Sequence, residues 1–161
     1  KIKKNSFFWF SQIIIMNIQE YMKDNKNRPF AVASMCADPI HHGHINIINQ
    51  AKRYGNVIIG LMTDEAMTGY KRKPLLKFEN RIKVIRELKS VANVLPFDNL
   101  NFADIAKKYK FEFFLHGDDW MHGVQAESRL RLIETMQQWG GKVIDVPYTE
   151  GISSTDLTSN L

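Results

Sequence analysis

The chain has 161 residues, of which 44% are hydrophobic, a length and composition that support one domain with a buried core. Its formal charge of +5 gathers near the start, because residues 1–29 hold six Lys or Arg and two Asp or Glu. The remaining chain is nearly neutral at +1, which argues against a nucleic-acid-binding face within the fold. A single cysteine, Cys36, excludes an internal disulfide framework and indicates a reducing compartment, so we expect a cytoplasmic protein.

Residues 1–29 are expected to form an N-terminal extension and linker, and residues 30–161 the folded domain. An apolar run at residues 7–16 follows three lysines, but it is shorter than the roughly 20 residues that cross a bilayer. No small-residue cleavage site follows that run. We therefore expect no firm membrane association, and the polar residues 24–29 lead into the domain.

Strands and helices are predicted to alternate along the domain. The strands are apolar throughout, which is typical of a parallel sheet covered on both faces, and they are expected at residues 30–36, 57–62, 91–97, 111–115 and 142–146. Helices are expected at residues 45–54, 78–91, 102–109 and 125–139, with two short ones capped by Thr63 or Asp64 and by Ser153 or Ser154. This alternation predicts an α/β fold with a Rossmann-like, doubly wound, parallel five-stranded sheet.

The turn between the first strand and the first helix concentrates polar residues, namely Asp38, His41, His42, Gly43 and His44. Such turns bind ligands in α/β sheets, and the unpaired N–H groups of the following helix favour phosphate. These histidines supply too few ligands for a zinc site, and no other Cys or His pair has zinc spacing. They suit donors aimed at the charge that develops in phosphoryl or nucleotidyl transfer. The alternative is that they only cap the helix or pack, and His42 is expected to be a bystander.

Each of the other polar stretches has two possible interpretations, one functional and one structural. The basic residues 71–73 either form a solvated loop or fold over a triphosphate. Asp118 and Asp119 either hold Mg²⁺, which prefers carboxylate and phosphate oxygens, or fix their own loop. Trp120 either stacks near a base or is a core aromatic. The hydroxyls of residues 153–155 either bind an anion together with the helix N–H groups or only cap the last helix.

Together these motifs resemble the HxGH nucleotidyltransferase superfamily. Asp38-x-x-His41-x-Gly43-His44 is similar to its signature. The order of the other motifs resembles the glycerol-3-phosphate cytidylyltransferase-like branch: Thr63-Asp64-Glu65, Arg72-Lys73-Pro74, Phe78-Glu79-Asn80-Arg81, Gly117-Asp118-Asp119-Trp120 and Thr149-Glu150-Gly151-Ile152-Ser153-Ser154-Thr155. The resemblance covers about residues 30–157.

The resemblance implies transfer of CMP from CTP to a small phosphonate or phosphorylated alcohol, with release of pyrophosphate and with Mg²⁺ carried on CTP. His41 and His44 would stabilise the transition state, and Lys71, or Arg72 under another alignment of the loop, would neutralise the phosphates. No metal site made by the protein itself is expected. The implied nucleotide-binding residues are Asp38, Gly43, Arg72, Arg81, Gly117, Asp118, Asp119, Trp120, Ile152, Ser153, Ser154 and Thr155.

At two places the sequence departs from the pattern of the glycerol-3-phosphate cytidylyltransferase-like branch. Met35-Cys36 stands where the branch has Gly-Thr, and Tyr148 stands where it has Arg. Residues 116–125, Trp139-Gly140-Gly141 and Pro147-Tyr148-Thr149 look more like cytidylyltransferase domains associated with phosphoenolpyruvate mutase in phosphonate biosynthesis. That likeness implies a phosphonate acceptor and a chain fused to or partnered with such a mutase. We also expect a homodimer. The alternatives are a glycerol-3-phosphate or ethanolamine-phosphate cytidylyltransferase, an ATP-using adenylyltransferase, and a non-catalytic binding or membrane-surface module that uses residues 1–29.

Overall fold

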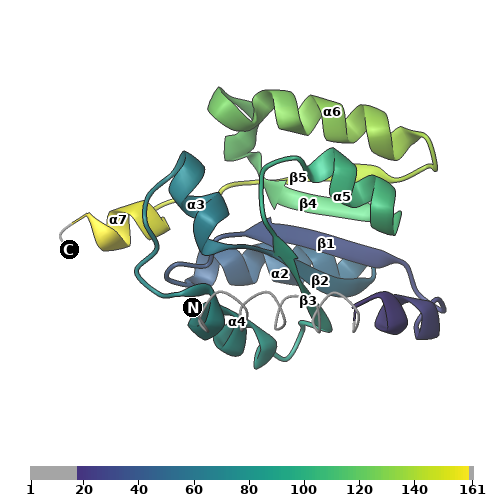
Figure 1. Cartoon of the computed structure of the whole chain (residues 1–161), viewed down its shortest axis with the longest axis horizontal. Helices are drawn as coiled ribbons and strands as arrows, with labels where there is room; N and C mark the ends of the chain where they lie inside the picture. Colours follow the sequence, from purple (N-terminus) through teal and green to yellow (C-terminus); the bar gives the residue numbers. More distant parts are fainter. Residues whose placement is uncertain (1–17, 160–161) are drawn as a thin grey trace, which may run out of the picture.

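A parallel five-stranded sheet forms the centre of the protein. The computed structural model describes residues 18–159, and Figure 1 shows its strands running side by side. The strands are β1 (Phe30–Met35), β2 (Asn56–Met62), β3 (Asn93–Phe97), β4 (Phe113–Gly117) and β5 (Lys142–Val146), in the spatial order β3-β2-β1-β4-β5. The chain winds outward from β1 to β3, then crosses back to β4 and β5. The predicted doubly wound α/β fold is confirmed.

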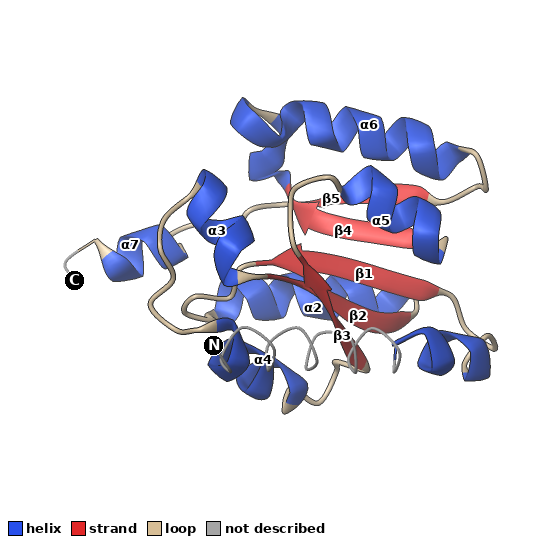
Figure 2. Cartoon of the chain, in the orientation of Figure 1, coloured by secondary structure: helices blue, strands red, loops and turns tan. Residues whose placement is uncertain are grey.

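Helices cover both faces of the sheet (Figure 2). On one face, α2 (His42–Tyr54) and α4 (Phe78–Arg86) pack against alternate residues of β1 and β2, such as Ala33 and Ile59. On the other face, α5 (Phe102–Tyr109) and α6 (Ala126–Gln137) pack against Val32, Ile58 and Phe114. Each large apolar side chain that is fully buried contributes about 1.5–3 kcal/mol, so both apolar faces of the strands stabilise the fold.

Several predicted element bounds are corrected. Helix α2 begins three residues early, at His42, because the His41 side chain caps it. Helix α4 ends at Arg86, and residues 87–91 form successive i→i+3 turns instead of more helix. Strand β4 begins two residues late, at Phe113, where its pairing with Ala31 of β1 and Lys142 of β5 starts.

The two short helices have the predicted kind of cap. Thr63 caps α3 (Asp64–Tyr70), with its Oγ1 accepting the N–H of Ala66 at 3.3 Å. Ser153 caps α7 (Ser154–Thr158), with its Oγ accepting the N–H of Asp156 at 2.9 Å. Two 3₁₀ turns, η1 (Asp118–Met121) and η2 (Gly123–Gln125), connect β4 to α6. The caps place both helices beside the carboxyl ends of the strands (Figure 1).

The segment predicted as an extension contributes to the core. Residues 18–24 are helical, and Ile18 is fully buried in the cluster that also contains Phe30 and Phe114. Tyr21 and Met22 pack against the same cluster. The predicted apolar run at residues 7–16 lies outside the described residues. Between residues 18 and 159, no helix has the length and apolar character to span a membrane.

Candidate active site

A pocket of about 470 Å³ opens at the carboxyl ends of β1, β2 and β4, around Cys36, Met62 and Gly117. This edge of the sheet is where its winding reverses, and α/β folds bind ligands there. The predicted site residues that line the pocket are His41, Gly43, His44, Lys71, Gly117, Asp119, Ile152, Ser153, Ser154 and Thr155. Those that do not line it are Asp38, Arg72, Arg81, Asp118 and Trp120.

The two histidines hold each other at the start of α2. His41 Nδ1 accepts the N–H of Gly43 at 3.1 Å, and His44 Nδ1 accepts the N–H of His41 at 3.2 Å. Their ring centroids are 4.0 Å apart. A neutral imidazole carries one proton, so a ring that accepts at Nδ1 donates from Nε2. Each ring therefore has an Nε2–H as its remaining donor, and both rings line the pocket.

Both histidines are neutral at neutral pH. Burial lowers the pKa of His44 to about 3, and the electrostatic interactions of a protonated His44 with His41 and Lys71 also lower it. Burial also lowers the pKa of His41, again with contributions from His42 and Lys71. Two uncharged donors thus lie beside a lysine without repelling it, an arrangement suited to an anionic ligand.

Gly43 is required by the packing of the His41 ring. A Cβ at position 43 would lie 2.9 Å from two atoms of the His41 imidazole, closer than van der Waals contact allows. The N–H of Gly43 is also the donor that fixes His41 Nδ1. The lack of a side chain at Gly43 therefore allows the His41 ring to pack against the backbone at the start of α2, the helix that His41 caps.

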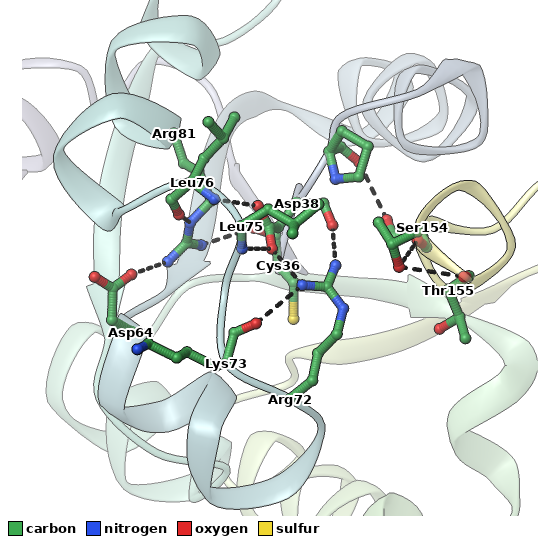
Figure 3. A network of polar contacts seen from close by, with 12 residues as sticks. Cys36, Asp38, Asp64, Arg72, Lys73, Leu75, Leu76, Arg81, Ser154 and Thr155 are labelled. Carbon is green, nitrogen blue, oxygen red and sulfur yellow. Dashed lines mark hydrogen bonds and ion pairs between the residues drawn. The ribbon is translucent and has the colours of Figure 1, made fainter. Parts of the chain in front are cut away.

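Asp38 holds the loop that follows Lys71 (Figure 3). Its fully buried carboxylate accepts the N–H groups of Leu75 and Leu76 at 2.8 and 2.9 Å and pairs with Arg72 Nη1 at 2.8 Å. Arg72 also donates to the carbonyl oxygen of Asp38. Burial opposes ionisation, but these donors outweigh it and lower the pKa of Asp38. Asp38 and Arg72, predicted to bind nucleotide, are here engaged with each other and with the loop.

Arg81, which the family resemblance implied to bind nucleotide, instead occupies an internal position among backbone carbonyls and Asp64. Its fully buried guanidinium donates from Nε to the carbonyl of Leu76 at 2.9 Å and from Nη1 to those of Cys36 and Met62 at 2.8 Å. Nη2 pairs with Asp64 at 2.7 Å. Arg81 therefore ties the ends of β1 and β2 to the start of α3 (Figure 3).

Trp120 is a core aromatic, so the alternative of stacking on a base is not supported. It is 1% exposed and stacks on His116 at 4.4 Å and on Phe114 at 5.6 Å between ring centroids. Its indole N–H donates to Asp145 at 2.7 Å, and Arg129 pairs with the same carboxylate. The indole of Trp120 thus packs behind His116, which lines the pocket.

The two aspartates of the Gly-Asp-Asp-Trp stretch have different surroundings. Asp118 Oδ1 accepts the N–H of Tyr148 at 3.1 Å, which is the predicted loop-fixing alternative. Asp119 lines the pocket, and its side chain is 58% exposed. Among the described residues, no three His, Cys, Asp or Glu side chains converge into a metal-binding group. Asp119 is the acidic side chain that the pocket offers to a cation.

The turn before α7 closes the pocket beside the histidines. Ser154 Oγ donates to the carbonyl of Pro39 at 3.1 Å, which joins residues far apart in sequence (Figure 3). Ser154 is buried, whereas Thr155 is exposed at the rim. Asn46 of α2 donates to Thr149 Oγ1 at 3.0 Å. The last segment is thereby held against the start of α2.

His116, Cys36 and Tyr70 are among the pocket residues that the predicted site did not include. Burial lowers the pKa of His116, and it lies directly at the end of a buried strand, a position that marks it as a candidate. Cys36 Sγ and Tyr70 Oη are 2.9 Å apart, and burial raises the pKa of both groups. No sequence pattern indicated the contact between Cys36 and Tyr70. The two residues are 34 positions apart in the chain, and only the placement of α3 after β2 brings Tyr70 to Cys36 at the end of β1.

Comparisons with known proteins agree with this geometry. Residues 35–160 match the family model described as cytidylyltransferase-like. A probable ethanolamine-phosphate cytidylyltransferase from Schizosaccharomyces pombe is 31% identical over 128 residues, which cover 78% of this chain and 34% of that protein. The bifunctional protein HldE from Gluconobacter oxydans is 30% identical over 129 residues, which cover 78% of this chain and 26% of that protein.

The fold also has a solved counterpart. The crystal structure of the lipopolysaccharide core biosynthesis protein from Thermoplasma volcanium has a TM-score of 0.66 at 17% identity, covering 77% of this chain and 100% of that one. The chain spans about a third of the length of the Schizosaccharomyces pombe relative, and less of HldE. On the match over residues 35–160, the chain belongs to the cytidylyltransferase-like family.

Proposed function

We propose that the protein transfers CMP from CTP to a small acceptor that carries a phosphate or phosphonate, releasing pyrophosphate. An acceptor oxygen attacks the α-phosphorus of CTP in line, and the bond to the pyrophosphate leaving group breaks. The observation that carries this proposal is the pair of neutral imidazoles of His41 and His44, each with an Nε2–H donor, beside Lys71 in one pocket. Fixed donors stabilise the charge that develops on transferring phosphoryl oxygens.

Each part of the pocket has its own task. Lys71 neutralises the triphosphate, and Gly43 allows the His41 ring to pack against the start of α2, where the ring lines the pocket. Beside the histidines, the turn before α7 offers the exposed hydroxyl of Thr155 to the ligand, and Ser153 caps the helix that carries it. Asp38 and Arg81 act as positioning residues, because the loop and strand ends that they bind carry the pocket residues.

Asp119 is the pocket residue that would hold a Mg²⁺ ion carried on the triphosphate of CTP, because Mg²⁺ prefers carboxylate and phosphate oxygens. The ion would supply neutralisation of part of the triphosphate charge.

The acceptor is a phosphorylated alcohol or a phosphonate. Relatives named as ethanolamine-phosphate cytidylyltransferases favour the phosphorylated alcohol. Tyr148, which lines the pocket where the branch has arginine, favours the phosphonate and a functional link to phosphoenolpyruvate mutase. The single cysteine fits a cytoplasmic location. We also propose a homodimer, which would cover exposed apolar side chains outside the pocket such as Leu130, which is 58% exposed.

The test is a pyrophosphate-release assay with Mg²⁺ and either CTP or ATP. Each nucleotide is offered with ethanolamine phosphate, glycerol 3-phosphate or 2-hydroxyethylphosphonate, and products are identified by mass. We expect CTP to be used with at least one acceptor and ATP to be used about tenfold less efficiently or worse. Faster turnover of ATP would favour the adenylyltransferase alternative. Turnover of neither nucleotide with any acceptor would contradict the proposal.

A further inference from the structure

A second hollow lies at the opposite end of the sheet from the active pocket. Its volume is about 570 Å³, and it sits where β1 and β4 begin, beside Phe30 and Glu112. Figure 1 shows the helical residues 18–24 and the end of α5 at this end, whereas α3 and α7 lie at the other. The hollow is lined by Gln19, Met22, Lys23, Lys26, Arg28, Phe30, Lys108, Tyr109, Lys110 and Glu112.

Positive charge dominates this hollow. Three cations come from residues 23–28 and two from residues 108–110, and all five are exposed. Within residues 18–159, none of the five forms an ion pair with an acidic side chain. The one acidic lining residue, Glu112, has its Oε2 engaged by the N–H of Phe30 at 2.8 Å. Five gathered cations repel one another and attract an anion.

The backbone supports the gathering of these charges. Lys110 ends α5 in the left-handed conformation, with φ at 49°, where Gly or Asn is usual. Lys108 Nζ lies 5.2 Å from the centroid of the Tyr109 ring, which keeps this ammonium at the rim. Lys108 and Lys110 therefore both lie at the end of α5 that lines the hollow.

We propose that this hollow is a second anion site, distinct from the active pocket, which binds a phosphate-bearing ligand. Lysine and arginine would bind the phosphate, because their N–H groups form charge-assisted hydrogen bonds with its oxygens. Met22, Phe30 and Tyr109 form an apolar floor for an organic group attached to it. A soluble phosphate ester and an anionic phospholipid headgroup present this same chemistry. The inference does not depend on the proposed function, because no residue of the active pocket takes part.

The test follows backbone amide resonances of the full chain during titration with inorganic pyrophosphate. We expect the amides of Arg28 and Lys110 to shift as one group, with an affinity separate from that reported by Gly43 in the active pocket. In the charge-reversal variant K26E/R28E/K110E, the affinity at the second site should fall about tenfold or more, and added salt should mimic the loss. Turnover of CTP should stay unchanged, because these residues lie outside the active pocket.

A matched variant, K52E/K83E/K89E, makes the same change of charge at exposed lysines outside both hollows. It should bind pyrophosphate at the second site like the unmodified protein. A neutral variant, K26Q/R28Q/K110Q, repeats the test if charge reversal prevents folding, which circular dichroism will report.

A second arm distinguishes the source of the phosphate. Vesicles of phosphatidylglycerol are compared with vesicles of phosphatidylcholine in a sedimentation assay. Binding to the anionic vesicles that K26E/R28E/K110E abolishes identifies a lipid headgroup, and a pyrophosphate response without vesicle binding identifies a soluble ligand. The proposal is overturned if neither probe binds, or if K26E/R28E/K110E binds both as tightly as K52E/K83E/K89E does.

Discussion

His44 has two separable tasks, and substitutions that preserve one at a time should tell them apart. Its Nδ1 accepts the N–H of His41 and thereby completes the cap of α2, while its Nε2–H is the donor offered to the pocket. His44→Asn keeps an acceptor near the position of Nδ1 but removes the distant donor. His44→Gln keeps an N–H donor near the position of Nε2, and His44→Ala removes both.

The expected magnitudes follow from these contacts. Loss of one preorganised donor lowers kcat by about 10²- to 10³-fold, so His44→Asn and His44→Ala should both lose turnover on this scale. Loss of a cap costs about 0.5–2 kcal/mol, so His44→Ala should also be less stable, while His44→Asn should not. His44→Gln should retain more turnover than His44→Asn.

The measurements are steady-state release of pyrophosphate from CTP and unfolding in urea. His42→Ala is the control, because His42 is exposed and does not line the pocket. It should change kcat by less than about threefold, in line with a surface substitution. Turnover of His44→Asn equal to that of His42→Ala would refute the assignment of His44 as a donor.

Three further predictions follow from other contacts. Gly43→Ala places a Cβ 2.9 Å from the His41 ring and should displace the ring, so kcat should fall by about tenfold or more. An unchanged kcat would show that the position of the His41 ring is not critical for turnover. Arg81→Met removes the ion-pair partner of Asp64 and the side-chain donor to the carbonyls of Cys36 and Met62, so the free energy of unfolding should fall by about 3–5 kcal/mol. A fall of less than about 1 kcal/mol, measured by urea denaturation, would contradict the internal role. The unfolded chain protonates His44 near its ordinary pKa of 6.5, whereas the folded chain does so only at about 3, so the free energy of unfolding should decline as pH falls through this window. Each such histidine lowers the free energy of unfolding by up to about 1.4 kcal/mol per pH unit. The lowered pKa values of His41 and His116 add to the decline. Urea denaturation of His44→Gln between pH 6 and pH 4 should show a pH dependence that is smaller by the contribution of one histidine.

Strand and helix order could be predicted because it depends on local patterns. Continuous apolar runs fit strands buried on both faces, and β5 and α5 have the predicted bounds. The caps at Thr63 and Ser153 were among the predicted alternatives because a hydroxyl before a helix satisfies its free N–H groups. The bounds of α4 and β4 could not be predicted in the same way, since long-range contacts decide where an amphipathic or apolar run stops.

The sequence by itself determined the family resemblance, the fold class and the polar turn at His41 to His44, because each is carried by residues that are neighbours in the chain. Only the tertiary structure decided which polar side chains face the pocket. Asp38, Arg81 and Trp120 match the family's motifs, yet burial and their hydrogen bonds turn them inward. The basic hollow likewise exists only in the fold, because it joins cations about eighty residues apart. A motif fixes which residues are present, whereas burial and hydrogen bonding fix which atoms remain free to act.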